Sequence, residues 1–216
     1  MNITIPCLLD AQDDRRLNSN ESSNLRLVLE HIKRLNFNNV TIFHPHNQEV
    51  VEVILPNVKI LGNSYFIQQV ISKIPVGLED IGKDNHLILM STDAGGFKPL
   101  MKLCDKIGWK GETFSASKSR KYEDGKSKLV QLIGREDFGG KDVLIIDDIC
   151  VYGGTFVGLA KLLKERNVGK LYLAVSHVTV SNPNPELVGL YDTIFTTNSK
   201  GIGYNVSPIE ILPYRI

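Results

Sequence analysis

The 216-residue sequence has no surplus of charge of either sign and no long apolar run. It contains 25 lysine and arginine residues against 24 aspartate and glutamate residues, which gives a formal net charge of +1. This balance argues against electrostatic binding to nucleic acid or to a membrane surface. No apolar stretch approaches the roughly 20 residues of a membrane-spanning helix. The N-terminal stretch turns acidic and polar too early for a signal peptide, so we expect a cytoplasmic protein.

Cysteine is also scarce, and the sequence has no internal repeat or low-complexity segment. The cysteines Cys7, Cys104 and Cys150 are odd in number and have no paired spacing, which fits a reducing compartment better than a disulfide framework. With 42% hydrophobic and 23% charged residues, the composition is that of an ordinary globular protein. The chain is long enough for one large domain or for two small α/β lobes.

Apolar, β-branched runs alternate with amphipathic stretches along the first half of the chain. Between residues 24 and 35 the apolar side chains recur at helical spacing, which predicts a helix. The other expected elements of this half are a strand at 40–43, a short extended piece at 51–55, a helix at 65–74, a buried strand at 87–90, and a helix containing Phe97 to Ile107.

The clearest pattern lies in the second half. Residues 142–146 read as a strand, 147–154 as a loop, 155–166 as a helix and 171–175 as a further strand. This strand–helix–strand crossover is the building block of a parallel sheet. Before it, residues 115–128 are polar, highly charged and contain glycine, so we expect a long mobile loop there.

The loop after the strand at 142–146 carries chemistry suited to a phosphosugar. Asp147 and Asp148 at a strand end can accept hydrogen bonds from the vicinal hydroxyls of a ribose. Gly153 and Gly154 let backbone N–H groups close around a phosphate at a helix N-terminus, and Thr155 adds a hydroxyl donor. No lysine follows the glycines, so this is not a Walker A loop. The plainer alternative is a strand-to-helix turn with solvated aspartates.

A second loop, Ser91 to Gly96, also joins an apolar strand to a helix. Gly95 and Gly96 allow close approach of the backbone to an anion, and Asp93 could orient a metal or a hydroxyl. Taken alone, this loop fits better as a helix N-cap followed by two flexible residues.

The sequences of these loops resemble motifs of one family. The string from Ile145 to Thr155 resembles the phosphoribosyl diphosphate (PRPP) binding signature of type I phosphoribosyltransferases and of ribose-phosphate pyrophosphokinases. The Asp-Ala-Gly-Gly at 93–96 looks like the diphosphate-side loop of the pyrophosphokinases. Residues 10–16 are similar to their segment that ends in Gln-Asp-Arg, and residues 43–48 resemble their metal-binding turn, with His46 in the histidine place. Without this resemblance, His44 and His46 would read as polar packing.

The resemblance implies an α/β fold and an activity. The expected architecture is a phosphoribosyltransferase-like parallel sheet flanked by helices over residues 63–216, preceded by a partial second lobe of the same type over residues 1–62. The implied reaction moves a diphosphate from ATP to ribose 5-phosphate and gives PRPP. The implied cofactor is Mg²⁺, and the implied partners are ATP, ribose 5-phosphate or PRPP, and further copies of the chain in a homo-oligomer.

The resemblance also implies site residues. Lys118 and Arg120 would act catalytically from a flexible loop that folds over the ATP phosphates, where cations can stabilise a transferring phosphoryl group. The alternative for this basic stretch is a solvated surface. The implied ribose-5-phosphate ligands are Asp147, Asp148, Tyr152, Gly153, Gly154 and Thr155; the ATP or diphosphate ligands are Asp14, Arg15, Gly95 and Gly96; and the metal ligands are His46 and Asp93.

The chain departs from this family at several positions. Gln12 stands where an arginine is usual, His44 where an aspartate is usual, and Val151 where an acidic residue is usual. The additional strands and helices with which pyrophosphokinases begin are expected to be absent. Two alternatives therefore stay open beside the pyrophosphokinase: a phosphoribosyltransferase that uses PRPP, although no segment suited to covering a base is evident, and a catalytically impaired subunit that binds or regulates.

Overall fold

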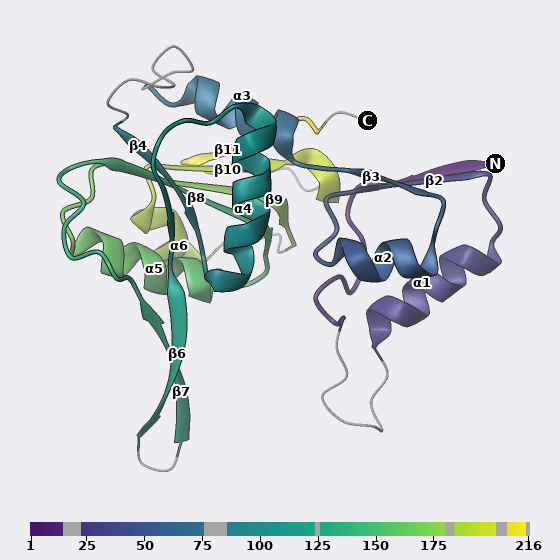
Figure 1. The fold of residues 1–216 in the computed structure, drawn as a ribbon, viewed down its shortest axis with the longest axis horizontal. Coiled ribbons are helices and arrows are strands. Elements are labelled where there is room, and N and C mark those ends of the chain that lie inside the picture. The colour runs from purple at the N-terminus through teal and green to yellow at the C-terminus, as the bar shows by residue number, and fades with distance from the viewer. Residues whose placement is uncertain (15–22, 76–85, 124–125, 180–183, 202–206, 215–216) are drawn as a thin grey trace.

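A computed structural model describes residues 1–14, 23–75, 86–123, 126–179, 184–201 and 207–214 (Figure 1). Within residues 118–132 it describes the backbone but not the side chains. In these ranges, no helix is long and apolar enough to cross a membrane.

The N-terminal part forms a three-stranded parallel sheet with two helices on one face (Figure 1). Its elements are β1 (Asn2–Ile5), α1 (Asn24–Arg34), β2 (Asn39–Phe43), α2 (Gln48–Ile54) and β3 (Val58–Leu61). The register aligns Ile5, Ile42 and Ile60, and these side chains pack with the buried faces of α1 and α2. The helix and the strand expected at 24–35 and 40–43 are therefore confirmed.

The extended piece expected at 51–55 is wrong, because residues 51–54 belong to α2 and Leu55 is its C-cap. Val51 and Ile54 are three residues apart, so they share one helical face, and both are buried. The Asn47 side chain accepts a hydrogen bond from the Val50 N–H at 3.1 Å and caps the helix. An N-cap residue followed by two apolar residues at helical spacing favours a helix over a strand.

The larger sheet has six parallel strands in the order β11-β10-β9-β8-β4-β5. Their bounds are β4 (Leu87–Ser91), β5 (Thr113–Ser115), β8 (Asp142–Cys150), β9 (Leu171–Val178), β10 (Thr193–Thr197) and β11 (Ile209–Leu212). Every residue of β4 and β9 is buried, as expected for central strands covered on both faces.

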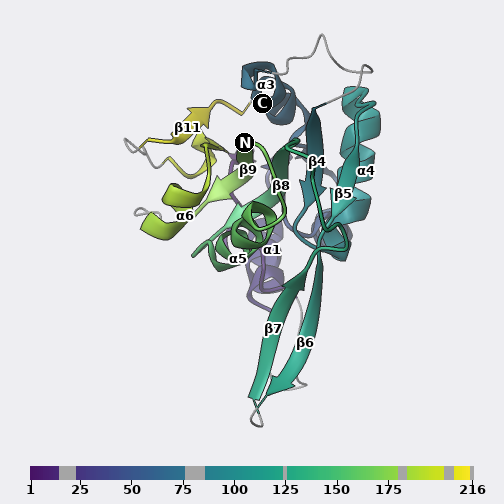
Figure 2. The same ribbon diagram turned by 90° about the vertical axis from the view of Figure 1, so that its left-hand side faces the viewer.

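Helices cover both faces of this sheet (Figure 2). On one face α3 (Ser64–Lys73) and α4 (Ala94–Ile107) pack with Leu89 and Leu144, and on the other α5 (Gly154–Lys164) and α6 (Pro185–Leu190) pack with Ile88 and Ile145. A short 3₁₀ turn, η2 (Asn198–Lys200), follows β10. The predicted fold class is confirmed. The predicted division at residue 62 falls between β3 and α3 and stays a prediction.

The loop expected at 115–128 is instead a β-hairpin. Strands β6 (Ser117–Glu123) and β7 (Lys126–Leu132) pair antiparallel over their whole length and project beyond the sheet (Figures 1 and 2). Each strand thus pairs its inward backbone groups with the other strand.

Candidate functional site

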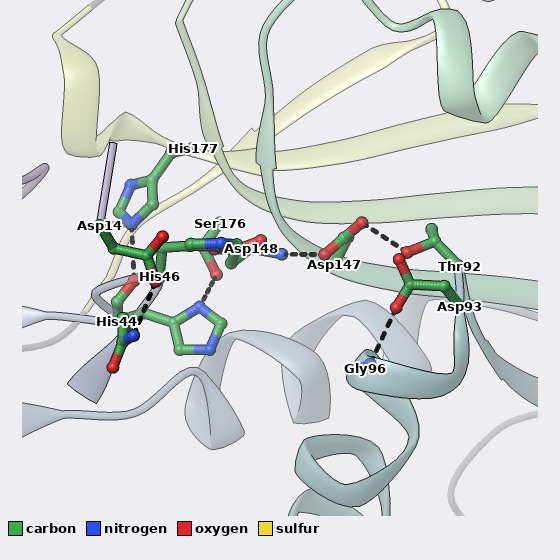
Figure 3. Close-up of polar contacts among 11 residues, drawn as sticks. Asp14, His44, His46, Thr92, Asp93, Gly96, Asp147, Asp148, Ser176 and His177 are labelled. Carbon is green, nitrogen blue, oxygen red and sulfur yellow. Dashed lines mark hydrogen bonds and ion pairs between the residues drawn. The ribbon is translucent and has the colours of Figure 1, made fainter. Parts of the chain in front are cut away.

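The candidate site lies where the carboxyl ends of the parallel strands meet (Figure 3). The smaller sheet contributes His44 and His46, which follow β2. The larger sheet contributes the loop after β4, the end of β8 and the end of β9. Parallel open sheets bind ligands at this edge. Residues 147–150, expected in a loop, belong to β8, since Ile149 and Cys150 still pair with β9.

Asp147 is held by two hydrogen bonds. The Thr92 hydroxyl donates to one carboxylate oxygen at 2.8 Å, and the backbone N–H of Asp148 donates to the other at 2.9 Å. Burial, followed by the charge of Asp148, raises the pKa of Asp147 to about 7. The Asp147 carboxyl therefore keeps its proton to a higher pH than a free aspartate does. Thr92 was not singled out from the sequence, although it lies in the second loop.

Asp148 is paired with a histidine from the other sheet. Its Oδ2 lies 2.5 Å from Nδ1 of His46. Burial alone would raise the pKa of the Asp148 carboxyl, but the hydrogen bond and charge of His46 outweigh burial and hold it below its usual range. The same hydrogen bond raises the pKa of His46. The two neighbouring carboxyls therefore differ: Asp148 carries the negative charge, while Asp147 tends to keep a proton.

Asp14 approaches this pair from the N-terminal part. The Asn47 side-chain amide donates to Asp14 Oδ2 at 2.7 Å, and the charge of Asp14 contributes to the raised pKa of His46, behind the larger effect of Asp148. The predicted ATP ligand Asp14 is thus close to the His46–Asp148 pair. Its predicted neighbour Arg15 lies outside the described residues.

Asp93 caps a helix. Its Oδ1 accepts a hydrogen bond from the Gly96 N–H at 3.1 Å, so it is the N-cap of α4. A Cβ added at Gly95 would lie 3.3 Å from that carboxylate oxygen, and one added at Gly96 would lie 3.3 Å from the Ser91 Cβ. The turn is therefore tight enough to favour glycine at both positions. This matches the N-cap alternative, and binding of a diphosphate or metal here stays a prediction.

The loop before α5 differs from the one before α4. Gly153 has φ 77° and stands at the N-cap of α5, and no side chain caps this helix among the described residues. Gly154 and Thr155 form its first turn, and Tyr152 is 81% exposed. The first amides of α5 therefore lack the intramolecular acceptor that Asp93 gives to α4. Backbone N–H groups without an acceptor, together with the positive end of the helix dipole, suit an anion such as phosphate.

The predicted metal ligands His46 and Asp93 do not form a ready-made metal centre. Each uses one atom on an intramolecular bond, and the described residues contain no group of three or more histidine, cysteine, aspartate or glutamate side chains able to hold an ion. Mg²⁺ in phosphoryl-transfer sites binds through one or two carboxylates together with substrate phosphates and water. Asp148, the ionised member of the carboxyl pair, is the residue here that would hold such an ion together with substrate phosphates.

Lys118 and Arg120 lie in β6, opposite Gln131 and Leu129 of β7. Their side chains are outside the description. The hairpin begins beside the site, because the Ala116 N–H donates to the Ser91 carbonyl at 3.1 Å, one residue before Thr92. The catalytic role of this pair stays a prediction.

Two of the three positions that depart from the family, Val151 and His44, pack against other residues. Val151 packs with the hydrophobic core of the smaller sheet, which also includes Ile149 of β8. Burial lowers the pKa of His44 to about 4, so this side chain is neutral at pH 7. Gln12 is exposed. Two expected carboxylates are thus replaced by an apolar and a neutral side chain.

This combination of fold and site defines a phosphoribosyltransferase-type protein. The family model for the phosphoribosyl transferase domain matches residues 63–206, and the chain belongs to this family. Among its curated relatives is the ribose-phosphate pyrophosphokinase of Aquifex aeolicus, 26% identical over 84% of this chain and 55% of that protein. The corresponding enzyme of Sulfurisphaera tokodaii is 24% identical over 97% of this chain and 69% of the relative.

The structural comparison agrees. The phosphoribosylpyrophosphate synthetase of Mycobacterium smegmatis superimposes with a TM-score of 0.77 at 19% identity, over 98% of this chain and 66% of that one. The similarity to ribose-phosphate pyrophosphokinases that the motifs indicated is therefore confirmed. The chain spans about half the length of the Aquifex relative.

Proposed function

We propose that the chain transfers the β,γ-diphosphate of ATP to the 1-hydroxyl of ribose 5-phosphate. The bond between the sugar oxygen and the β-phosphorus forms, the bond between the α,β-bridging oxygen and the β-phosphorus breaks, the hydroxyl loses its proton, and AMP leaves. The observation that carries this proposal is the Asp147–Asp148 pair on β8, followed by an uncapped helix that starts at Gly154. The named relatives are ribose-phosphate pyrophosphokinases.

The charge states of the two carboxyls suit a sugar with vicinal hydroxyls. Asp148, kept ionised by His46, accepts a hydroxyl proton in a hydrogen bond. Asp147, which tends to keep its proton, accepts a hydrogen bond from Thr92. Its carboxyl group can accept a hydrogen bond from a sugar hydroxyl or donate one to it. The 5-phosphate binds the first amides of α5, with the Thr155 hydroxyl as a further donor. When bound with ATP, Mg²⁺ would neutralise charge at the transferring group. Lys118 and Arg120 add positive charge from the hairpin.

An impaired, regulatory form is the second candidate, and a specific observation favours it. Val151 packs in a hydrophobic core and His44 is neutral, at two positions where the pyrophosphokinases have acidic residues. Such a chain would bind ribose 5-phosphate without turnover.

A transferase that consumes PRPP shares the same loop and would instead act with a nucleobase or nicotinamide in the absence of ATP. Assembly as a homo-oligomer and a cytoplasmic location are part of the leading proposal.

Gly153→Ala tests the phosphate-binding role of the loop. The new Cβ would lie 2.9 Å from Leu187 Cδ2 at a residue with φ 77°, so both the side chain and the backbone oppose it. We expect a loop displacement that weakens ribose-5-phosphate binding about 10-fold or more, from a strain of roughly 1–3 kcal/mol. Isothermal titration calorimetry measures the affinity.

Gly108→Ala is the matched control. Gly108 has φ 72° at the C-terminal end of α4, where a Cβ meets nothing within 4 Å. It introduces a similar backbone strain away from the loop, so it should lower stability and keep the affinity. Equal affinities for the wild type and Gly153→Ala would place the phosphate elsewhere.

A further inference from the structure

The segment that carries His46 is fastened to the larger sheet at several points (Figure 3). Nδ1 of His44 lies 2.7 Å from the Ser176 hydroxyl, and Nε2 of His177 lies 3.1 Å from the His44 carbonyl oxygen. The Phe43 ring meets the His177 ring edge-on, with 5.4 Å between centroids, and stacks on Tyr214 at 4.9 Å. These contacts join β2 to β9 and to the chain after β11.

The hydrogen bonds determine which nitrogen of His177 carries a proton. A carbonyl oxygen only accepts, so Nε2 of His177 must be the donor to His44. Burial lowers the pKa of His177, so the ring is neutral and its Nδ1 is an acceptor. The Ser199 hydroxyl, 2.7 Å away, then donates its one proton to Nδ1. The competing acceptor, the Ser176 carbonyl, is farther from this hydroxyl, at 3.2 Å, and already accepts from the Thr197 hydroxyl at 2.6 Å. Ser199 therefore holds His177 in the tautomer that can bind the His44 carbonyl.

The backbone conformation of His44 indicates why the hydrogen bond from His177 matters. His44 has φ 38°, a left-handed conformation that residues with a side chain rarely adopt. Such a conformation persists where the surroundings hold it. Two residues later, His46 contacts Asp148 at 2.5 Å. His177 is thus bonded to the carbonyl of the strained residue that lies between β2 and the site histidine.

We propose that His177 is a positioning residue, which holds the His44 carbonyl and thereby keeps His46 against Asp148 across the two sheets. The functional meaning of the inference rests on the proposed function, because Asp148 is taken there as a ribose ligand. The geometric claim is independent of turnover. Within the described part of the chain, the His177 ring bonds to His44 and Ser199 and not to Asp147 or Asp148, so it acts through His44.

Two substitutions at His177 separate this role from simple packing. In His177→Gln, the amide NH₂ takes the place of Nε2 and can still donate to the His44 carbonyl, while the contact with Ser199 is lost. In His177→Asn, the shorter amide takes the place of Nδ1, so the Ser199 contact is kept and the His44 contact is lost. Circular dichroism and thermal melting of both variants check that they fold.

The readout is the proton shared by His46 and Asp148. In ¹H–¹⁵N spectra of protein labelled in the histidine rings, a short histidine–carboxylate hydrogen bond gives a strongly downfield Nδ1–H resonance, which His46→Gln assigns by removing it. We expect the resonance in the wild type and in His177→Gln, and its loss in His177→Asn. If His177→Asn does not fold, Ser199→Ala, which removes the donor that holds the His177 tautomer, is expected to weaken the resonance.

Several results would overturn the inference. The first is absence of the resonance in the wild type. The second is its persistence in His177→Asn or, where that variant is unfolded, in Ser199→Ala. The third is its loss in His177→Gln as well. None of these depends on PRPP formation. A protein that shows the expected pattern but makes no PRPP would keep the positioning role and lose the proposed function.

Discussion

Lys118→Ala is expected to lower the rate of diphosphate transfer about 1,000-fold or more while sparing ribose-5-phosphate binding. A cation that reaches the transferring phosphoryl group only in the transition state contributes on this scale. The hairpin that carries Lys118 begins next to the loop after β4, since the Ala116 N–H binds the Ser91 carbonyl. The 5-phosphate loop belongs to a different strand, β8, so its affinity should be unaffected.

Lys170→Ala is the control for the loss of one positive charge. Lys170 is exposed and precedes β9, at the opposite end of that strand from His177. Its replacement should change neither turnover nor binding. The measurements are AMP release for turnover and calorimetry for ribose 5-phosphate. Undiminished turnover in Lys118→Ala would remove this lysine from the catalytic assignment.

Asp148→Asn is expected to weaken ribose-5-phosphate binding about 10- to 100-fold, because a hydrogen bond to a charged group is worth roughly 1.5–3 kcal/mol. The asparagine keeps the size of the side chain but not the charge that His46 maintains. It also leaves the His46 ring without its carboxylate. Calorimetry with ribose 5-phosphate measures the loss.

Asp105→Asn provides the comparison. Asp105 is exposed near the C-terminal end of α4, and the site lies beyond the N-terminal end of that helix. It removes one carboxylate charge away from the site and should retain wild-type affinity. Full affinity in Asp148→Asn would mean that the sugar hydroxyls bind elsewhere.

The central unit of the fold could be predicted from local sequence. The apolar run Val143 to Ile146 is buried in β8, and the glycine pair before an amphipathic stretch starts α5 as expected. Local patterns suffice here because strand, turn and helix follow one another within a short stretch of chain. The same holds for the strand and helix on either side of Asp93.

Two local errors had signals that could have been used. The Asn47 cap and the spacing of Val51 and Ile54 were those of a helix. In the polar segment after β5, the dipeptide Asp124-Gly125 is a common hairpin connection. Polarity outweighed this dipeptide in the prediction, because low hydrophobicity is typical of loops.

The contacts between the two sheets could not be predicted. His44 and Ser176 are 132 residues apart, and His46 and Asp148 are 102 residues apart. No local pattern encodes which strand ends meet at such separations. The sequence therefore indicated the separate loops of the site, whereas the pairing of Asp148 with His46 and the role of Ser199 at His177 required the tertiary structure.

A coupled assay of AMP release with ATP, ribose 5-phosphate and Mg²⁺ tests the central claim most directly, with omission of ribose 5-phosphate as the control. The proposed function predicts AMP formation that depends on ribose 5-phosphate. If no AMP forms under these conditions, while calorimetry still detects binding of ribose 5-phosphate or PRPP, the proposed diphosphate transfer is contradicted. The chain would then be a phosphoribosyl-binding protein.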